Sequence, residues 1–283
     1  MENLAAEHLR AGLMSPRSTT CKQTERKNIL PDLLWASTKS GEAAQTTWKN
    51  LRDGRVGNVR LVYADLDDGM IQNVCKYWWN KSGAQWPAAD EFRTGCTYEH
   101  AGYYLHWLLA FFGPVRKVAS FASLLVPDKL TGQTPAELAP DFTVAHLYFD
   151  HDIIARLTCS VVGSHNHQLS IFGDDGSLFV DEAWDFWSDL WYLPPLPRRL
   201  KKKLKLGSRP PLFSWNDVAN KGQRMNYAVG VEDLADAIAS DRRPRLCGEM
   251  GAHVVEVLEA IQYPPSPEPV IIRSRCPPMQ PLG

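Results

Sequence analysis

Two consecutive pairs of β-rich segments constrain this chain more than any other feature of its sequence. They are residues 142–149 with 153–161, and residues 167–172 with 177–181. Asp150-His151-Asp152 joins the first pair and Gly173-Asp174-Asp175-Gly176 joins the second, and connections this short link antiparallel neighbours. Two further strands are predicted at 59–63 and 116–124. The sequence therefore predicts a largely antiparallel sheet of at least five strands.

The segment 153–161 shows how that sheet is covered. Apolar side chains alternate along it with Arg156, Thr158 and Ser160, so one face is predicted to be buried and the other polar. Helical patterns supply the cover, and they span about 41–52, 94–112, 231–239 and 248–261. The predicted fold class is α+β, an open and mostly antiparallel sheet with helices on one face.

The domain organisation follows from where periodic patterns stop. Residues 1–35 carry little periodic signal and are predicted to be a poorly ordered remnant, whereas 36–265 form the α+β domain. Within it, residues 72–93 are predicted to be a long aromatic loop, and 183–229 a proline-rich excursion from the sheet. The excursion contains a basic run, 198–205, for which a solvated loop is favoured over a nuclear-localisation or phosphate-binding patch. The Pro-rich tail, 266–283, is predicted to be an extended edge.

Composition excludes several classes of protein. With 283 residues and a net charge of −1, the chain has no general attraction for nucleic acid or anionic membranes. No signal peptide and no membrane-spanning segment is recognisable, so a cytoplasmic location is predicted. The six cysteines are scattered without a Cys-x-x-Cys pair, which favours reduced thiols over a zinc ribbon or a disulfide framework.

The helix at 94–112 concentrates the reactive side chains. Its apolar stripe comprises Tyr98, Ala101, Leu105, Leu108, Leu109 and Phe112. Its other positions carry Glu99, His100, Tyr103, Tyr104 and His106, a set suited to proton transfer. Gly95 precedes the helix and Gly102 lies inside it, which permits close approach of a ligand or another backbone. The alternative, a core helix with satisfied polar groups, is the commoner case and stays open.

Other chemical motifs are weak or missing. His165-Asn166-His167 could present two imidazoles to a metal, but structural histidines are favoured because Leu169 and Ile171 share that strand face. No metal site is predicted. The chain contains no Gly-x-Gly-x-x-Gly, no phosphate loop and no His-Glu-x-x-His, so no cofactor-binding residue is predicted either.

Several stretches, read in order, resemble a known family. They are Gly41 to Gly57 with the strand at 59–63, Thr94 to Leu105, Val229 to Ile238, Arg242-Arg243-Pro244, and His253 to Ile261. Together they are similar to the region downstream of the Rossmann domain in the Gfo/Idh/MocA family of nicotinamide-dependent oxidoreductases, over about residues 36–262. The departures are the absent Gly-x-Gly-x-x-Gly half and Leu13-Met-Ser-Pro-Arg17, which stands where Glu-Lys-Pro is expected.

The resemblance implies a function and a set of residues. It implies hydride transfer between NAD(P) and a sugar-like or polyol substrate, with His100 or Tyr104 as general acid/base and Glu99 as orienting carboxylate. His100 stands where the family often has Asp, and Tyr104 where it often has His. The implied substrate-binding residues are Trp86, Cys96, Tyr103 and His106. Homo-oligomers through the open sheet face are also implied.

Because the cofactor-binding half is missing from the sequence, the chain alone is not expected to bind NAD(P) or to run that reaction. Two alternatives stay open. One is a non-catalytic binding or oligomerisation module, and the other is an incomplete gene product.

Overall fold

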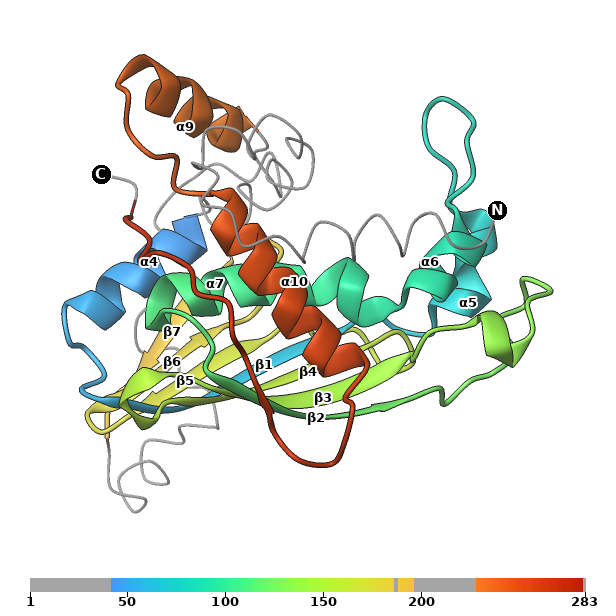
Figure 1. Ribbon diagram of the computed structural model, residues 1–283, viewed down its shortest axis with the longest axis horizontal. Coiled ribbons are helices and arrows are strands. Elements are labelled where there is room, and N and C mark those ends of the chain that lie inside the picture. The colour runs from blue at the N-terminus through green and yellow to red at the C-terminus, as the bar shows by residue number, and fades with distance from the viewer. Residues whose placement is uncertain (1–41, 186–187, 196–227, 282–283) are drawn as a thin grey trace.

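The fold is built on one mixed sheet of parallel and antiparallel strands. It is seen in a computed structural model, which describes residues 42–185, 188–195 and 228–281. The strands of this described part are β1 Val59–Asp67, β2 Lys117–Ser123, β3 Phe142–Tyr148, β4 Ile154–Ser160, β5 Leu169–Gly173, β6 Gly176–Val180, β7 Leu190–Leu193 and β8 Val270–Ile271. Their order across the sheet is β7-β6-β5-β1-β4-β3-β2-β8. The sheet is open, with β7 and β8 at its two edges, and Figure 1 shows its strands side by side.

The central strand, β1, determines the topology. It runs parallel to β4 and antiparallel to β5, whereas the other strand pairs are antiparallel. The predicted hairpins β3–β4 and β5–β6 are confirmed. Because β1 lies between them, the chain from β4 to β5 has to pass over its end. That passage places residues 161–168 next to the carboxyl end of β1.

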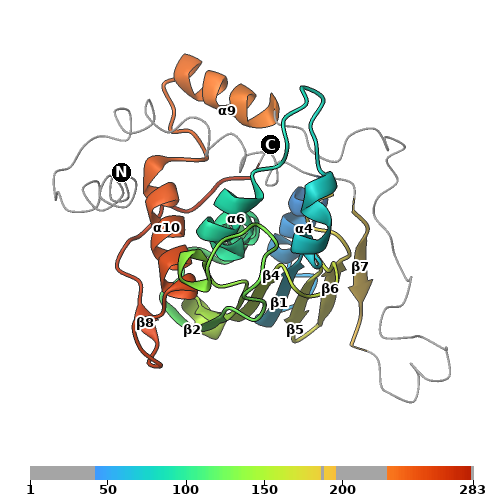
Figure 2. The same cartoon turned by 90° about the vertical axis from the view of Figure 1, so that its right-hand side faces the viewer.

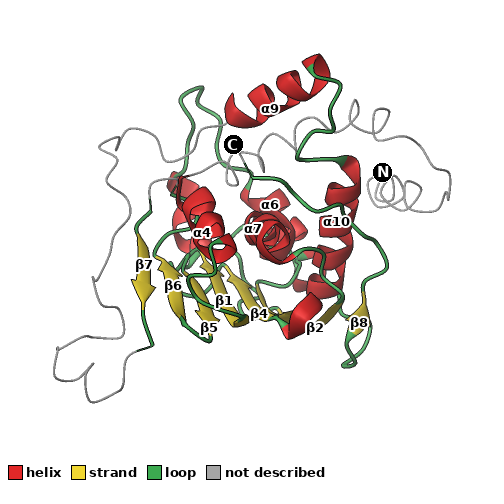
Figure 3. Cartoon of the chain, turned by 90° about the vertical axis from the view of Figure 1, so that its left-hand side faces the viewer, coloured by secondary structure: helices red, strands yellow, loops and turns green. Residues whose placement is uncertain are grey.

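Helices cover one face of the sheet. In the described ranges they are α4 Glu42–Arg52, α5 Ile71–Val74, α6 Ala88–Thr94, α7 Gly102–Phe112, α9 Ala228–Ala239 and α10 Gly248–Gln262. Seen end-on, α4, α7 and α10 form a layer above the strands, and α9 lies farther out (Figures 2 and 3). The α+β class with helices on one face is therefore confirmed. None of the described helices is long and apolar enough to cross a membrane.

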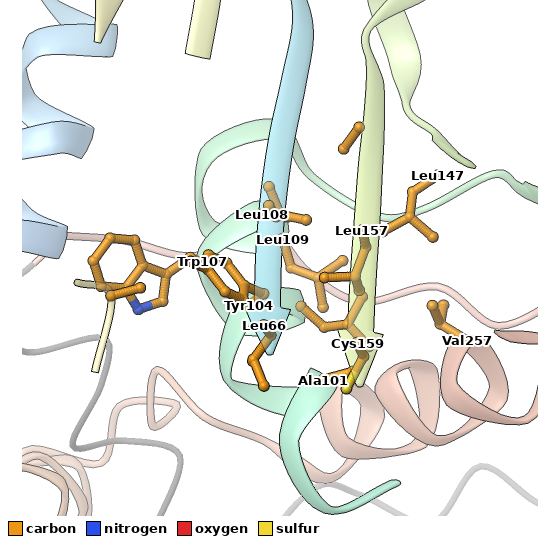
Figure 4. Close-up of a cluster of buried hydrophobic side chains, with 14 of the residues drawn as sticks. Leu66, Ala101, Tyr104, Trp107, Leu108, Leu109, Leu147, Leu157, Cys159 and Val257 are labelled. Atoms are coloured by element: carbon orange, nitrogen blue, oxygen red, sulfur yellow. The ribbon is translucent and has the colours of Figure 1, made fainter. Parts of the chain in front are cut away.

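The core lies between that helical layer and the sheet. Alternation along β1 buries Val62, Ala64 and Leu66 completely, because these side chains face the helices. Helix α7 is buried on most of its surface, since it lies against the sheet and α4 and α10 pack against it from either side (Figure 3). Figure 4 shows Tyr104 and Leu108 of α7 in the same cluster of buried side chains as Leu66 of β1 and Leu157 of β4.

The strand β4 shows the predicted separation of its two faces. Leu157 and Cys159 are buried against the helices, while Arg156 and Thr158 are partly exposed on the other face. Ser160 was expected on the exposed face, but it is buried because its hydroxyl donates a hydrogen bond to Asp67 at the end of β1.

Three local expectations need correction or completion. Residues 72–93 are not one long loop, because α5, the short 3₁₀ helix η1 (Cys75–Tyr77) and α6 occupy much of this stretch. The helix predicted at 94–112 is divided into a π-helical turn, η2 (Thr97–Ala101), and α7. The segment 183–229 contributes the edge strand β7.

The two ends of the chain differ in what the structure describes. The tail forms an extended edge as predicted, since β8 pairs with β2. Residues 1–35 and the basic run 198–205 lie outside the described residues.

Candidate functional site

A buried carboxylate at the end of β1 joins two histidines. Oδ2 of Asp68 lies 2.7 Å from Nδ1 of His100, and Oδ1 lies 2.9 Å from Nε2 of His167. Asp68 follows directly on β1, His100 belongs to η2, and His167 precedes β5. Burial raises the pKa of Asp68, but the two histidines outweigh it and hold that pKa well below its usual range. Asp68 is therefore ionised and shared between both rings.

His100 is positioned by the irregular start of its helix. Gly95 has φ of +91°, and a Cβ there would lie 2.7 Å from Ala139 Cβ. Gln262 of α10 accepts a hydrogen bond from the Tyr98 N–H and donates one to the Thr94 carbonyl. These contacts fix the π-helical turn, and such turns are frequent at functional sites.

The protonation of His100 follows from its neighbours. Burial lowers its pKa, but the contacts with Asp68 and Glu99 outweigh that effect and raise the pKa to about 10. Nε2 lies 3.5 Å from Glu99 Oε1, which is beyond the usual length of a hydrogen bond. His100 is thus an imidazolium at neutral pH. Its Nε2 lies near the Glu99 carboxylate but is too far from it for a short hydrogen bond.

His167 and His165 share a second carboxylate. Glu182 lies 2.8 Å from Nδ1 of His167 through Oε1 and 2.9 Å from Nε2 of His165 through Oε2. Burial lowers the pKa of His167, but Asp68 and Glu182 outweigh it and raise that pKa to about 9. His167 is buried, whereas the His165 side chain is 60% exposed. The chain of contacts therefore runs from the interior to solvent.

An indole packs against the cluster. The ring of Trp184 lies 4.3 Å from that of His167, 4.8 Å from Tyr103 and 5.2 Å from His100, measured between centroids. Its backbone N–H donates to Glu182 at 3.1 Å. Trp184 thus shields the histidines from water, which strengthens their contacts with the carboxylates.

A second pair of carboxyl groups adjoins His100. Burial, together with the neighbouring Glu99, raises the pKa of Glu91 to about 8, while the contacts of Glu99 with His100 and Glu91 lower the pKa of Glu99 against its burial. Both carboxyl groups line a pocket together with Trp86 and Cys96. This pocket offers hydrogen-bonding groups beside an aromatic wall.

The structure places the predicted site residues unevenly. It brings Glu99 and His100 together, with Trp86 and Cys96 lining the adjacent pocket. The ring of Tyr103 packs against Trp184, and Trp184 in turn packs against the ring of His100.

Two predicted residues lie deeper. The Tyr104 side chain is completely buried, and its hydroxyl has no hydrogen-bond partner among the described residues. His106 is buried, with Nδ1 lying 2.6 Å from the carbonyl oxygen of Gly102 one turn earlier. Both side chains of α7 therefore lie in the protein interior.

Sequence reasoning missed four members of the cluster, Asp68, His167, Glu182 and Trp184. Asp68 lies beyond the strand predicted at 59–63, and His167 belongs to a pair interpreted as structural. Glu182 and Trp184 fall where no periodic pattern exists. The one available signal was the spacing of His165 and His167, which lets both rings lie on the same side of an extended segment.

The carboxyl end of β1 does not fit the pyrophosphate of a dinucleotide. Asp65 and Asp67 belong to this end of the strand and Asp68 follows it, and their carboxylates would repel phosphate. The helix that follows, α5, has only four residues and supplies no glycine-rich turn at its start.

Residues 45–179 match the family model described as the GFO/IDH/MocA C-terminal domain. No curated protein sequence matches the chain at a significant level.

Many solved structures share the fold. One is the WlbA dehydrogenase from Bordetella pertussis in complex with NADH and UDP-GlcNAcA, with 17% identity, a TM-score of 0.57, and coverage of 84% of this chain and 62% of that one. An oxidoreductase from Agrobacterium radiobacter in complex with NAD+, L-tartaric acid and magnesium has 13% identity, a TM-score of 0.57, and coverage of 83% and 63%.

A third is the aldose-aldose oxidoreductase from Caulobacter crescentus complexed with glycerol, with 18% identity, a TM-score of 0.51, and coverage of 83% and 62%. At such identities the likeness establishes the fold. The chain spans less than two thirds of the length of each of these three proteins.

Proposed function

Because residues 45–179 match the family model of the GFO/IDH/MocA C-terminal domain, we propose that this chain forms the substrate side of an NAD(P)-dependent oxidoreductase acting on a sugar-like or polyol substrate. Support comes from the three relatives above, two of which were solved with a nicotinamide cofactor and two with a carbohydrate derivative or a polyol. The contacts around His100 supply the chemistry that such a reaction needs on the substrate side. The proposal includes a cytoplasmic location.

His100 is the proposed general acid/base. Oxidation of an alcohol releases a proton from its hydroxyl group, and the reverse reaction returns one to a carbonyl oxygen. With its pKa raised to about 10, His100 is protonated at neutral pH and can donate from Nε2 to that oxygen. Asp68 holds Nδ1 at 2.7 Å, so it orients the ring and stabilises the imidazolium.

Glu99 and the pocket beside it are the proposed substrate contacts. Ionised carboxylates accept hydrogen bonds from sugar hydroxyl groups, and Glu99 lies within reach of the same substrate that contacts Nε2 of His100. Trp86 also lines a larger aromatic pocket of about 540 Å³ together with Trp78 and Trp79, where it offers its ring to the apolar C–H face of a sugar. Tyr104 has no part in proton transfer in this proposal, because its hydroxyl is completely buried.

The nicotinamide cofactor would be held elsewhere. The carboxylates at the end of β1 disfavour its pyrophosphate there, so in this proposal a separate dinucleotide-binding domain supplies it. In this proposal the described residues of this chain bind the substrate and exchange a proton with it.

The observation that carries the proposal is the Asp68–His100–Glu99 arrangement beside the Trp86 pocket. Ligand-observed NMR with aldoses, polyols and nucleotide sugars tests it on the full chain. We expect saturation transfer to one of these classes, lost in Glu99→Gln and in Trp86→Ala and kept in Glu268→Gln, an exposed control. The proposal fails if no class binds, or if binding is equal in all three variants.

A second function has its own support. The sheet face opposite the helices carries aromatic side chains, with Tyr63 5.2 Å from Phe172 and Phe172 5.9 Å from Phe179 between ring centroids. Phe121 on the same face is 59% exposed. We propose that this face binds a second copy of the chain, because a broad apolar and aromatic surface is typical of subunit contacts.

A further inference from the structure

Three side chains near the end of β1 present ligand atoms of the kind that hold transition metals. Asp68, His165 and His167 each offer one oxygen or nitrogen, and these three atoms all lie within 4.8 Å of one another. Ligands of one tetrahedral zinc ion lie at about 2.0–2.2 Å from it, so three such atoms have to be within a few ångströms of each other. The cluster meets that requirement with little movement.

The orientation of His167 is the strongest part of this geometry. Its Nδ1 lies 2.8 Å from Glu182, which fixes the ring and directs Nε2 toward Asp68 at 2.9 Å. Metal-binding histidines typically use one nitrogen for the ion and give the other N–H to a carboxylate. Glu182 stands in that supporting position.

Asp68 and His165 are placed to complete the set. Oδ1 of Asp68 faces Nε2 of His167, whereas Oδ2 lies 2.7 Å from Nδ1 of His100. Each carboxylate oxygen is therefore directed to a different histidine. His165 is mostly exposed, and its ring lies 4.1 Å from that of His167 between centroids. An exposed ring can turn, so either of its nitrogens can reach an ion beside Asp68.

We propose that Asp68, His165 and His167 form a binding site for a divalent transition-metal ion, with zinc as the best match. Two imidazole nitrogens and one carboxylate oxygen suit zinc, whereas magnesium and calcium prefer oxygen ligands alone. Three protein ligands leave a fourth position, and the exposure of His165 directs that position to solvent. A small oxygen ligand, water or a hydroxyl group, can occupy it.

This site does not depend on the proposed oxidoreductase function. It would exist in a binding module as well, because none of its ligands requires a substrate. Its proton balance is simple. The proton on Nε2 of His167 leaves to solvent when the ion takes its place between that nitrogen and Asp68.

The experiment uses the full chain after removal of metals with a chelator. Calorimetric titration with zinc is expected to show one saturable site, and cobalt substitution is expected to give the visible absorption of a four-coordinate nitrogen and oxygen site. Magnesium is expected not to compete. His165→Gln carries little risk to folding because the side chain is exposed, and it is expected to weaken zinc binding at least 10-fold.

His146→Gln is the matched control, since it removes another exposed histidine on β3. It is expected to bind zinc as the wild type does. Glu182→Gln is expected to lower the affinity by about 10- to 100-fold through the orientation of His167. The proposal is overturned if zinc does not bind at about 100 µM, if His165→Gln binds like the wild type, or if bound cobalt shows thiolate absorption from cysteine.

Discussion

Ninety-nine positions separate Asp68 from His167 in the sequence, yet Oδ1 of the first lies 2.9 Å from Nε2 of the second. The contact exists because β5 pairs antiparallel with β1, and because Asp67 forms a further bridge with Asn166 beyond the strand ends. Strand pairing therefore assembles this site, and the predictions below depend on it.

The substitution His100→Gln is expected to abolish proton transfer. In a preparation that turns over with a cofactor-bearing partner, kcat should fall by about 10²- to 10⁴-fold, because glutamine cannot give up a proton. Tyr104→Phe is the control, since the lost hydroxyl is buried and has no hydrogen-bond partner among the described residues. Steady-state kinetics at matched folded fraction measures both. Equal loss in the two variants would show that the helix acts through its packing and not through His100.

The chain alone is expected not to bind NAD(H) or NADP(H) in the micromolar range. The sequence has no Gly-x-Gly-x-x-Gly turn to hold the pyrophosphate, the carboxylates of Asp67 and Asp68 repel phosphate at the end of β1, and α5 is too short to provide a helix N-terminus of useful strength. Calorimetric titration of the full chain checks this. A micromolar isotherm with either cofactor would contradict the prediction.

Glu91 is expected to make stability depend on pH. Its pKa is raised in the folded state to about 8 from an ordinary value near 4.5, so the folded chain favours the protonated carboxyl group. That contribution is complete below pH 4.5 and is lost as the pH rises through about 8. Glu91→Gln imitates the protonated group, so it should stabilise the fold above pH 8 by on the order of 1 kcal/mol after solvent screening.

Thermal melting between pH 4 and 9 measures the effect of Glu91→Gln. The difference from the wild type should be near zero at pH 4 and grow toward pH 9, whereas Glu268→Gln on an exposed loop should give a constant difference. A variant that is less stable than the wild type at pH 9 would contradict the assignment.

Substitution of two glycines allows the cost of backbone strain to be measured separately from the cost of steric overlap. Gly95 and Gly113 both end helices with positive φ, but a Cβ on Gly95 would lie 2.7 Å from Ala139 Cβ and 2.8 Å from Gln262 Oε1, whereas nothing lies within 4 Å of one on Gly113. Gly113→Ala should cost about 1–3 kcal/mol, because the positive φ with an extended ψ at this position is a conformation that is nearly restricted to glycine.

Gly95→Ala should cost at least about 2 kcal/mol more than Gly113→Ala, because the overlap adds to the strain and forces Ala139 or Gln262 to move. Urea denaturation of both variants checks the difference. Equal losses would mean that Gln262 moves aside freely and does not fix the start of η2.

The open sheet face is expected to hold copies of the chain together. Phe121→Lys places a charge on an exposed aromatic position of β2 and should shift the chain toward monomers. Light scattering at tens of micromolar measures the mass, with Ile238→Lys as a control because that exposed side chain lies on α9, away from the sheet. A wild-type chain that is strictly monomeric would remove the proposal.

The sequence by itself determined the elements and the class of fold. Alternation along β4 and the short turns of two hairpins are local properties, and so are the helical periods at 94–112 and 248–261, so the antiparallel sheet with helices on one face followed from them. The tail strand β8 was also expected as an extended edge. Glu99 and His100 were predicted to act together for the same reason, since neighbours in sequence stay neighbours in a helical turn.

Only the tertiary structure decided how these elements meet. The position of β1 between β4 and β5 is a long-range pairing without a local signal, and it alone brings Asp68 to His100 and His167. Glu182 and Trp184 lie outside any periodic segment and join the site because the chain returns past the end of β6. Burial of Tyr104 on a helix that is covered on most of its surface was likewise invisible in a pattern that reports one apolar stripe. Periodicity records which side chains turn inward, and the chemistry of this site depends on which of them then face each other.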